Sequence, residues 1–85
     1  MSWREACIPP HTPFQLAAQT VQILAEAYEL SPEEVEHDAS MLHTSSWSGL
    51  ELLAWVRDRH DWHASTCIYY LAALRRALRG QSPFM

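Results

Sequence analysis

The residues best suited to chemistry lie in the segment DRHDWH, from Asp58 to His63. On one continuous helix, His60, His63 and Cys67 would share a face, and two imidazoles with a thiolate form a plausible zinc ligand set. Asp61 interrupts that face, because an Asp between two apolar helices is a favoured N-cap. We therefore interpret the segment as a charged turn between helices and predict no metal site.

Cys67 follows His63 by one helical turn, so the two could be drawn as a nucleophile and its base. Cys67 is also in phase with the apolar residues of its helix, and we expect it to lie in the core. With only Gly49 and Gly80, the chain has no glycine-rich phosphate loop. The arginines near the end of the last helix suit the helix dipole; they are Arg75, Arg76 and Arg79. The sequence therefore predicts a protein that is not an enzyme.

Hydroxyl residues crowd the segment HTSSWSGLELLAW, from His43 to Trp55. Ser48 and Glu51 have the spacing of a capping box, in which each side chain bonds the other residue's backbone N–H. We interpret most of this crowding as a helix start. If any serine here is chemically modified, we expect it to be Ser46 rather than Ser48.

The same capping spacing recurs along the chain and divides it into helices. It occurs at Ser2 to Glu5, Thr12 to Gln15, Ser31 to Glu34 and Ser48 to Glu51. Proline stands at the first helical position after two of these caps, where its missing N–H costs nothing. We predict an all-α fold, a compact bundle of four helices in a single domain, 1–85. The expected helices are about 13–30, 32–42, 49–60 and 62–79, preceded by a short helical turn at Trp3 to Cys7.

Apolar spacing predicts which faces of these helices are buried. On the third helix, we expect Leu50, Leu53 and Ala54 to share one apolar side. Leu52, Trp55 and Val56 widen this apolar arc, so the helix should be packed on two sides or face a partner. The last helix should end near Arg79, with Gly80 just beyond it. The chain is also rich in aromatic residues, which are enriched at binding interfaces. The residues predicted to bind a partner are Trp47, Trp55, Trp62, Tyr69 and Tyr70.

Composition restricts the possible partners and location. Ten acidic and six basic residues give a net charge of −4, which argues against nucleic acid as the main partner. The longest apolar run is too short to cross a membrane, and no signal peptide is recognisable. Two cysteines suggest no disulfide framework. We expect a cytoplasmic protein, and the absence of Lys and Asn suggests a bacterial genome of high G+C content.

The stretches SPEEVEHDASML and WSGLELLAWVRDRHDWHASTCIYYLAA resemble an uncharacterised bacterial domain family of unknown function. In that family a Pro-Glu-Glu-Leu helix leads to a Trp-Asp-Asp-Gly turn, an apolar helix and a Cys-Asp-x-x-Thr-Ala-Leu motif. The resemblance implies a small helical accessory or interaction domain without catalytic activity. The matching residues are Ser31 to Val35, Ala39, Gly49, Leu50, Leu53, Trp55, Val56, Thr66, Ile68, Tyr69 and Tyr70.

A second resemblance is to acyl carrier proteins, which are also acidic bundles of four helices. VQILAEAYELSPEEVEHDASM is similar to their first helix and following loop. SSWSGLELLAWVRDRHDW is similar to their modified-serine turn and second helix. This resemblance implies phosphopantetheine attached to Ser46.

Together, these observations predict a small protein-protein interaction module such as an adaptor, chaperone, inhibitor or immunity protein. It would bind a partner protein, or a second copy of itself, through an aromatic and aliphatic helical surface, and acidic residues would attract a basic partner. This reading requires no cofactor. The alternative is an acyl carrier-like protein with phosphopantetheine on Ser46.

Overall fold

The computed structural model describes residues 16–84 and shows an all-α bundle of four helices within this range. They are α2 (Ala18–Tyr28), α3 (Pro32–Thr44), α4 (Gly49–His60) and α5 (Ala64–Leu78). This confirms the predicted fold class. The expected turn at Trp3 to Cys7 and the caps at Ser2 and Thr12 lie outside the described residues.

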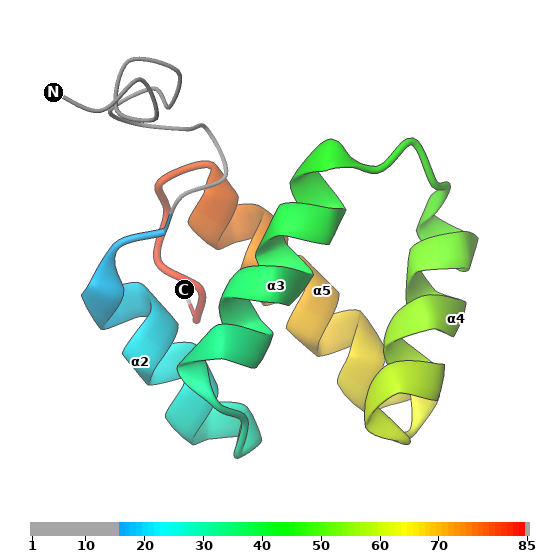
Figure 1. The fold of residues 1–85 in the computed structure, drawn as a ribbon, viewed down its shortest axis with the longest axis horizontal. Coiled ribbons are helices and arrows are strands. Elements are labelled where there is room, and N and C mark those ends of the chain that lie inside the picture. Colours follow the sequence, from blue (N-terminus) through cyan, green and yellow to red (C-terminus); the bar gives the residue numbers. More distant parts are fainter. Residues whose placement is uncertain (1–15, 85) are drawn as a thin grey trace, which may run out of the picture.

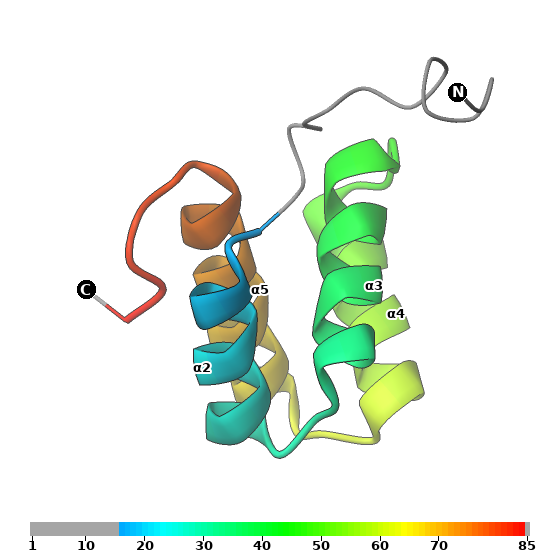
Figure 2. The ribbon, with the colours of Figure 1, turned by 60° about the vertical axis from the view of Figure 1, so that its left-hand side comes forward.

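The helices form two layers (Figures 1 and 2). One layer contains α2 and α5, and the other contains α3 and α4. Helix α3 packs against both α2 and α5, and α4 packs against α5. Helix α5 therefore joins the two layers, and its residues reach most of the core.

Two of the predicted capping boxes are confirmed. At the start of α3, Glu34 N–H donates to Ser31 Oγ over 3.2 Å, and Ser31 N–H donates to Glu34 Oε1 over 3.0 Å. At the start of α4, the corresponding bonds between Ser48 and Glu51 are 3.3 and 2.7 Å long. Each box satisfies two backbone donors that a helix start would otherwise leave free.

Helix α2 begins later than the sequence predicted. Ala17 is its N-cap, with extended backbone angles and no side-chain bond, so helical geometry starts at Ala18 rather than near residue 13. The early start was predicted from the capping spacing at Thr12 and the proline after it, which lie outside the described residues, and from an apolar pattern that continues across Ala17. At the other end, Glu29 adopts left-handed angles (φ 56°), and Leu30 N–H bonds the carbonyl oxygen of Ala25.

The turn between α4 and α5 also differs from the prediction. Asp61 does not cap the start of the last helix; it is the C-cap of α4, with left-handed angles (φ 56°). Asp tolerates this conformation better than most residues other than Gly. The N-cap of α5 is His63, so that helix begins at Ala64 instead of Trp62. Helix α3 is slightly longer than expected and ends at Thr44.

The end of α5 follows the pattern predicted from Gly80. Gly80 has φ 80°, its N–H bonds Ala77 O, and Gln81 N–H bonds Arg76 O, each over 2.9 Å. This pair of bonds is a Schellman motif. It reverses the chain, and Arg76 Nε then donates to Ser82 O over 3.0 Å. The segment after α5 is thereby directed back along the bundle.

The core is built from small and aliphatic side chains around α5. Its buried hydrophobic members are Val21, Leu24, Ala25, Val35, Ala39, Leu52, Val56, Cys67, Tyr70, Leu71, Ala73, Leu74 and Ala77. The predicted apolar side of α4 was wrong for Leu50, which is 79% exposed, and for Ala54, which is also exposed, whereas Leu53 is half-buried and packs against the core. The buried side chains of α4 are Leu52 and Val56. Apolar residues surround much of α4, so its spacing did not identify the side that faces α3 and α5.

Candidate functional site

A buried carboxylate, Asp38, links three helices of the bundle. Only 1% of the residue is exposed. Arg59 Nε donates to its Oδ1 over 2.7 Å, and the Tyr70 hydroxyl donates to Oδ2 over 2.5 Å. His60 Nε2 lies 2.8 Å from Oδ2. Because an ionised carboxylate only accepts hydrogen bonds, the His60 nitrogen must be the donor. We call Asp38, Arg59, His60 and Tyr70 the Asp38 network.

Aromatic rings enclose the Asp38 network on the side of α2. Trp62 stacks on His60, with ring centroids 4.5 Å apart, and meets Tyr70 edge to face at 5.1 Å. Tyr28 of α2 meets Tyr70 edge to face at 5.0 Å. Edge-to-face and offset pairs at these distances are favourable arrangements of aromatic rings. The rings therefore cover the network and restrict access of water to it.

The electrostatics of this region follow from burial and from the charge of Asp38. Burial raises the pKa of Tyr70 well above its usual range, and its hydrogen bond to Asp38 adds to the shift. Tyr70 is therefore a neutral donor at ordinary pH. Nearby, the hydrogen bond from Ser31 lowers the pKa of Glu34 on the exposed first turn of α3. The network thus contains a fully partnered carboxylate rather than a free acid or base.

This arrangement is suited to holding helices together. Every oxygen of Asp38 is occupied by a donor from α4 or α5, and His60 and Tyr70 are covered by aromatic rings. A substrate could reach the carboxylate only by breaking these contacts. Removing one partner of a buried ion pair leaves the other charge buried and unpaired, which destabilises a fold by several kcal/mol, about 3 to 5. We interpret the network as a structural clamp.

The three residues considered as zinc ligands, His60, His63 and Cys67, do not assemble. His60 is bonded to Asp38, Cys67 is fully buried, and His63 caps α5 on the surface. Burial raises the pKa of the Cys67 thiol, as expected of a core cysteine. Within residues 16–84, no group of three or more His, Cys, Asp or Glu could hold a metal ion.

No helix in the same range is long and apolar enough to cross a membrane.

The predicted partner-binding residues fall into three groups: one is buried, two are half-buried and two are exposed. Tyr70 is fully buried and cannot contact a partner in the folded chain, so that prediction was wrong. Its hydroxyl satisfies Asp38, which explains how a phenol is accommodated in the core. Trp55 and Trp62 are half-buried and pack against the core. Trp47 and Tyr69 are exposed, and Tyr69 is the more accessible at 70%.

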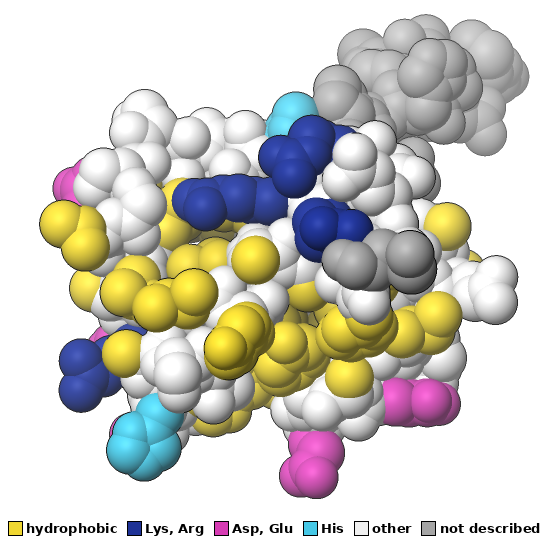
Figure 3. Space-filling view, turned by 180° about the vertical axis from the view of Figure 1, so that it is seen from behind, with side chains coloured by type: hydrophobic (Ala, Val, Ile, Leu, Met, Phe, Trp, Pro, Cys, Tyr) yellow, Lys and Arg dark blue, Asp and Glu magenta, His cyan; other side chains and the backbone are white. Residues whose placement is uncertain are grey.

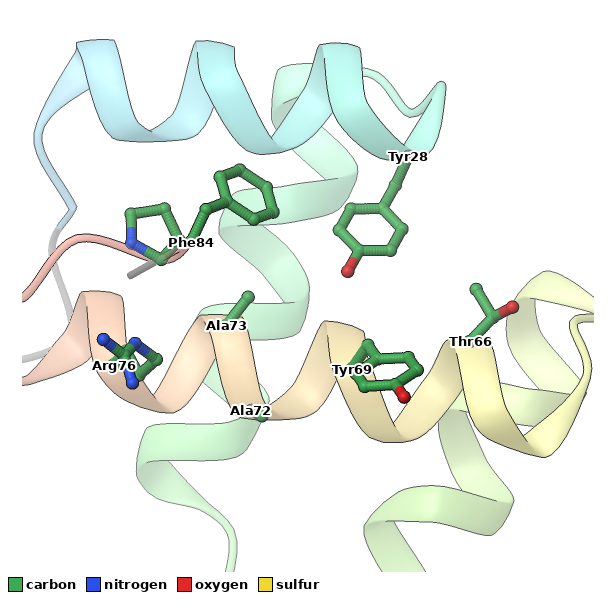
Figure 4. Close-up of a pocket in the computed structure, with 8 residues that line it drawn as sticks. Tyr28, Thr66, Tyr69, Ala72, Ala73, Arg76 and Phe84 are labelled. Carbon is green, nitrogen blue, oxygen red and sulfur yellow. The ribbon is translucent and has the colours of Figure 1, made fainter.

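A groove runs between α2 and α5 next to Tyr69 (Figure 4). It has a volume of about 510 Å³, and its lining residues are Tyr28, Thr66, Tyr69, Ala72, Ala73, Arg76, Pro83 and Phe84. Phe84 lies between the two helices because the chain reverses at Gly80. About half of Phe84 (52%) remains exposed. The groove is mainly apolar, and its charged lining residue is Arg76.

The outer side of α5 continues this apolar surface. Ile68 is 53% exposed, and Ala72 is exposed between Tyr69 and Arg76. We call Ile68, Tyr69, Ala72 and the adjoining groove the α5 face. Figure 3 shows an apolar band across this side of the molecule, with a group of cationic side chains above it and acidic ones below it at the centre and right. A further cationic side chain lies at the lower left and an acidic one at the upper left. Large exposed apolar patches on small proteins commonly mark interaction sites.

Arginines lie at one end of the α5 face. Arg75 and Arg79 are exposed and Arg76 is half-buried. Both ion pairs of the described residues involve Asp38, so these three arginines form none there. The charges nearest this end of the α5 face are therefore positive.

Ser46 lies in the loop between α3 and α4 and is exposed. It precedes Ser48, which is committed to the capping box of α4. Trp47 separates the two serines, and its ring lies 5.8 Å from that of Trp55. Ser46 and Ser48 are both exposed, but only Ser46 has a hydroxyl that does not cap a helix.

Sequence reasoning missed the Asp38 network. A signal was present, because Asp38 shares a helix face with the buried residues Val35 and Ala39. A charged residue on a buried face requires a partner. The sequence did not specify that Arg59 and His60, 21 and 22 residues away, would supply it.

No protein-family model, curated protein or solved structure matches this chain. Its function is therefore inferred from its own residues and their arrangement.

Proposed function

We propose that this chain is a small non-enzymatic protein-protein interaction module that binds a protein through the α5 face. Adaptor, chaperone, inhibitor and immunity roles all use such a surface. The observation that carries the proposal is the exposure of Tyr69 and Ile68 beside an apolar groove. Tyr is enriched among interface residues that contribute strongly to binding.

The free energy gained by covering exposed apolar side chains supports a binding role for the α5 face. An exposed aromatic side chain that becomes fully buried gains about 1.5 to 3 kcal/mol from its apolar area. Tyr69, Ile68 and Phe84 are all at least half exposed, so covering all three would contribute a few kcal/mol to binding. The Asp38 network offers no comparable surface, because its groups already bind one another.

Photo-crosslinking in the cell that makes the protein tests the proposal. Tyr69 is replaced by a photoreactive phenylalanine derivative, and the masses of the adducts are measured. We expect covalent adducts to a protein from position 69. The matched control carries the same group at Leu50, which is exposed on α4 outside the groove. No protein adduct at position 69, or equal adducts at both positions, would reject the α5 face as the binding surface.

The second candidate function is an acyl carrier-like protein with phosphopantetheine on Ser46. The exposure of Ser46 in the loop before α4 favours it, because a transferase must reach the hydroxyl. Co-expression with a phosphopantetheinyl transferase, followed by intact mass measurement, tests it. The expected adduct disappears in Ser46→Ala and persists in Ser65→Ala, an exposed serine on α5. An unmodified mass for the unaltered chain would eliminate this candidate.

A further inference from the structure

The two ends of the α5 face carry opposite charges. At the carboxyl end of α5 are Arg75, Arg76 and Arg79, which form no ion pair within residues 16–84. At its amino end lie Asp61, the C-cap of α4, and Glu29, the C-cap of α2. Asp58 and Arg57 line a hollow together with Asp61, so this end carries three acidic side chains and one cationic one. The three acidic residues are exposed.

The position of Glu29 at this end follows from its neighbour Tyr28. The Tyr28 ring contacts Trp62, just before α5, and Tyr70 on its second turn, with centroids 5.5 and 5.0 Å away. Tyr28 and Thr66 line the same end of the groove, opposite Arg76 and Phe84 (Figure 4). The carboxyl end of α2 therefore lies beside the amino end of α5.

Between these charged ends the surface is apolar. Ile68, Tyr69 and Ala72 lie on the exposed side of α5, and Thr66 and Arg76 are ten residues, about 15 Å, apart along it. The order along the face is thus mainly acidic, apolar and basic. Figure 3 shows a cationic group above the apolar band and acidic side chains below it, with a further cationic side chain at the lower left. Such a surface is complementary to itself when reversed.

A half-turn about an axis lying in the interface and perpendicular to α5 would place two such helices antiparallel. The apolar centres would then meet, and the arginines of each copy would face Glu29 and Asp61 of the other. Two-fold interfaces require this kind of self-complementarity, because the same patch contributes from both chains.

We propose that a second copy of this chain occupies the α5 face, forming a symmetric dimer with antiparallel α5 helices. This inference rests on the proposed function and names its partner. The net charge of −4 repels at long range, but charges more than about 8 Å apart are largely screened at physiological salt. The opposite charges that meet at the interface therefore determine whether two copies associate.

Analytical ultracentrifugation of purified full-length chain tests the dimer, with two charge-reversed variants. One variant carries Arg75→Glu and Arg79→Glu, and the other carries Glu29→Lys and Asp61→Lys. Each alone would place like charges opposite each other, so we expect its dimerisation to weaken by about tenfold or more. All four positions are exposed, and circular dichroism checks that the variants fold.

Mixing the two variants gives the decisive measurement. In a mixed dimer, the new glutamates of one chain face the new lysines of the other, and the unaltered charges also pair. We therefore expect the mixture to form dimers about as well as the unaltered chain. The control Glu36→Lys changes an exposed charge on α3 and should leave dimerisation unchanged.

Two results would overturn the inference. A monomeric unaltered chain would reject the dimer but leave the proposed function standing if the crosslink from position 69 joins a different protein. A dimer that tolerates both reversals, and also Ile68→Ser, would use another surface and would reject the α5 face in both proposals. A crosslinked adduct at twice the mass of the chain would agree with the dimer.

Discussion

Tyr69 and Tyr70 are adjacent in the sequence but lie in opposite environments. Tyr70 is fully buried, donates to Asp38 and contacts three other aromatic rings. Tyr69 is 70% exposed beside the groove. On the inner side of α5 the polar groups of the Asp38 network satisfy one another, whereas on the outer side apolar side chains remain uncovered.

This difference separates residues that stabilise the fold from residues available for binding. Loss of a partner in the Asp38 network leaves a buried charge or donor unsatisfied, which is costly. Removal of a side chain on the α5 face costs the isolated chain little stability, because these side chains are largely exposed. The two regions should therefore respond differently to matched substitutions.

The largest expected effect comes from Asp38→Ala. It leaves Arg59, His60 and Tyr70 without their acceptor, and breaking a buried ion pair costs about 3 to 5 kcal/mol. Urea denaturation followed by circular dichroism measures the loss. Glu36→Ala removes an exposed acid from the same helix and should change the free energy of unfolding by no more than about 0.5 kcal/mol. Equal effects of the two changes would contradict the structural role of Asp38.

A smaller difference should separate the two adjacent tyrosines. Tyr70→Phe keeps the ring but removes a hydrogen bond to a charged group, at a cost of about 1.5 to 3 kcal/mol. Tyr69→Phe removes an exposed hydroxyl and should be within about 0.5 kcal/mol of the unaltered chain. Parallel thermal and urea unfolding of both variants measures the contrast. A Tyr70→Phe variant as stable as Tyr69→Phe would show that the bond to Asp38 contributes nothing.

Alkaline pH should weaken the inner region. The pKa of Tyr70 is raised in the folded chain, so its contribution is complete below about pH 10, the pKa of an unfolded tyrosine, and declines at higher pH. The free energy of unfolding should fall by up to about 1.4 kcal/mol per pH unit for each tyrosine kept neutral. Urea unfolding between pH 9 and 11 measures this slope.

The variants of the previous comparison serve as controls for the pH series. Tyr70→Phe should flatten the slope and Tyr69→Phe should not. Part of the slope will remain in Tyr70→Phe, because burial also raises the pKa of Tyr28 and of Cys67. An unchanged slope in Tyr70→Phe would contradict the neutral, buried phenol.

The smallest effect is expected on the outer side. Phe84→Ala removes a half-exposed ring from the groove, and half of the burial energy of a Phe side chain is about 1 kcal/mol. Leu50→Ala, at a more exposed position, should lie within about 0.5 kcal/mol of the unaltered chain. Differential scanning calorimetry compares the two. A loss near that of Asp38→Ala would place Phe84 in the core.

Local signals in the sequence predicted the helices, whereas contacts between distant residues could not be predicted from it. Ser31 and Ser48 initiate helices with partners three residues away, so their roles could be read directly. The face of α4 could not, because apolar residues surround much of that helix and only packing selects Leu52 and Val56. Tyr70 and Tyr69 also looked alike until the position of Asp38 distinguished them.

The three partners of Asp38 come from two other helices, 21 to 32 residues along the chain. If α3 met α4 alone, the Tyr70 donor would be missing; if it met α5 alone, Arg59 and His60 would be missing. A partly assembled bundle would thus keep this carboxylate in water or bear the cost of its desolvation. We therefore expect α3, α4 and α5 to exchange their amide hydrogens with solvent as a single cooperative unit.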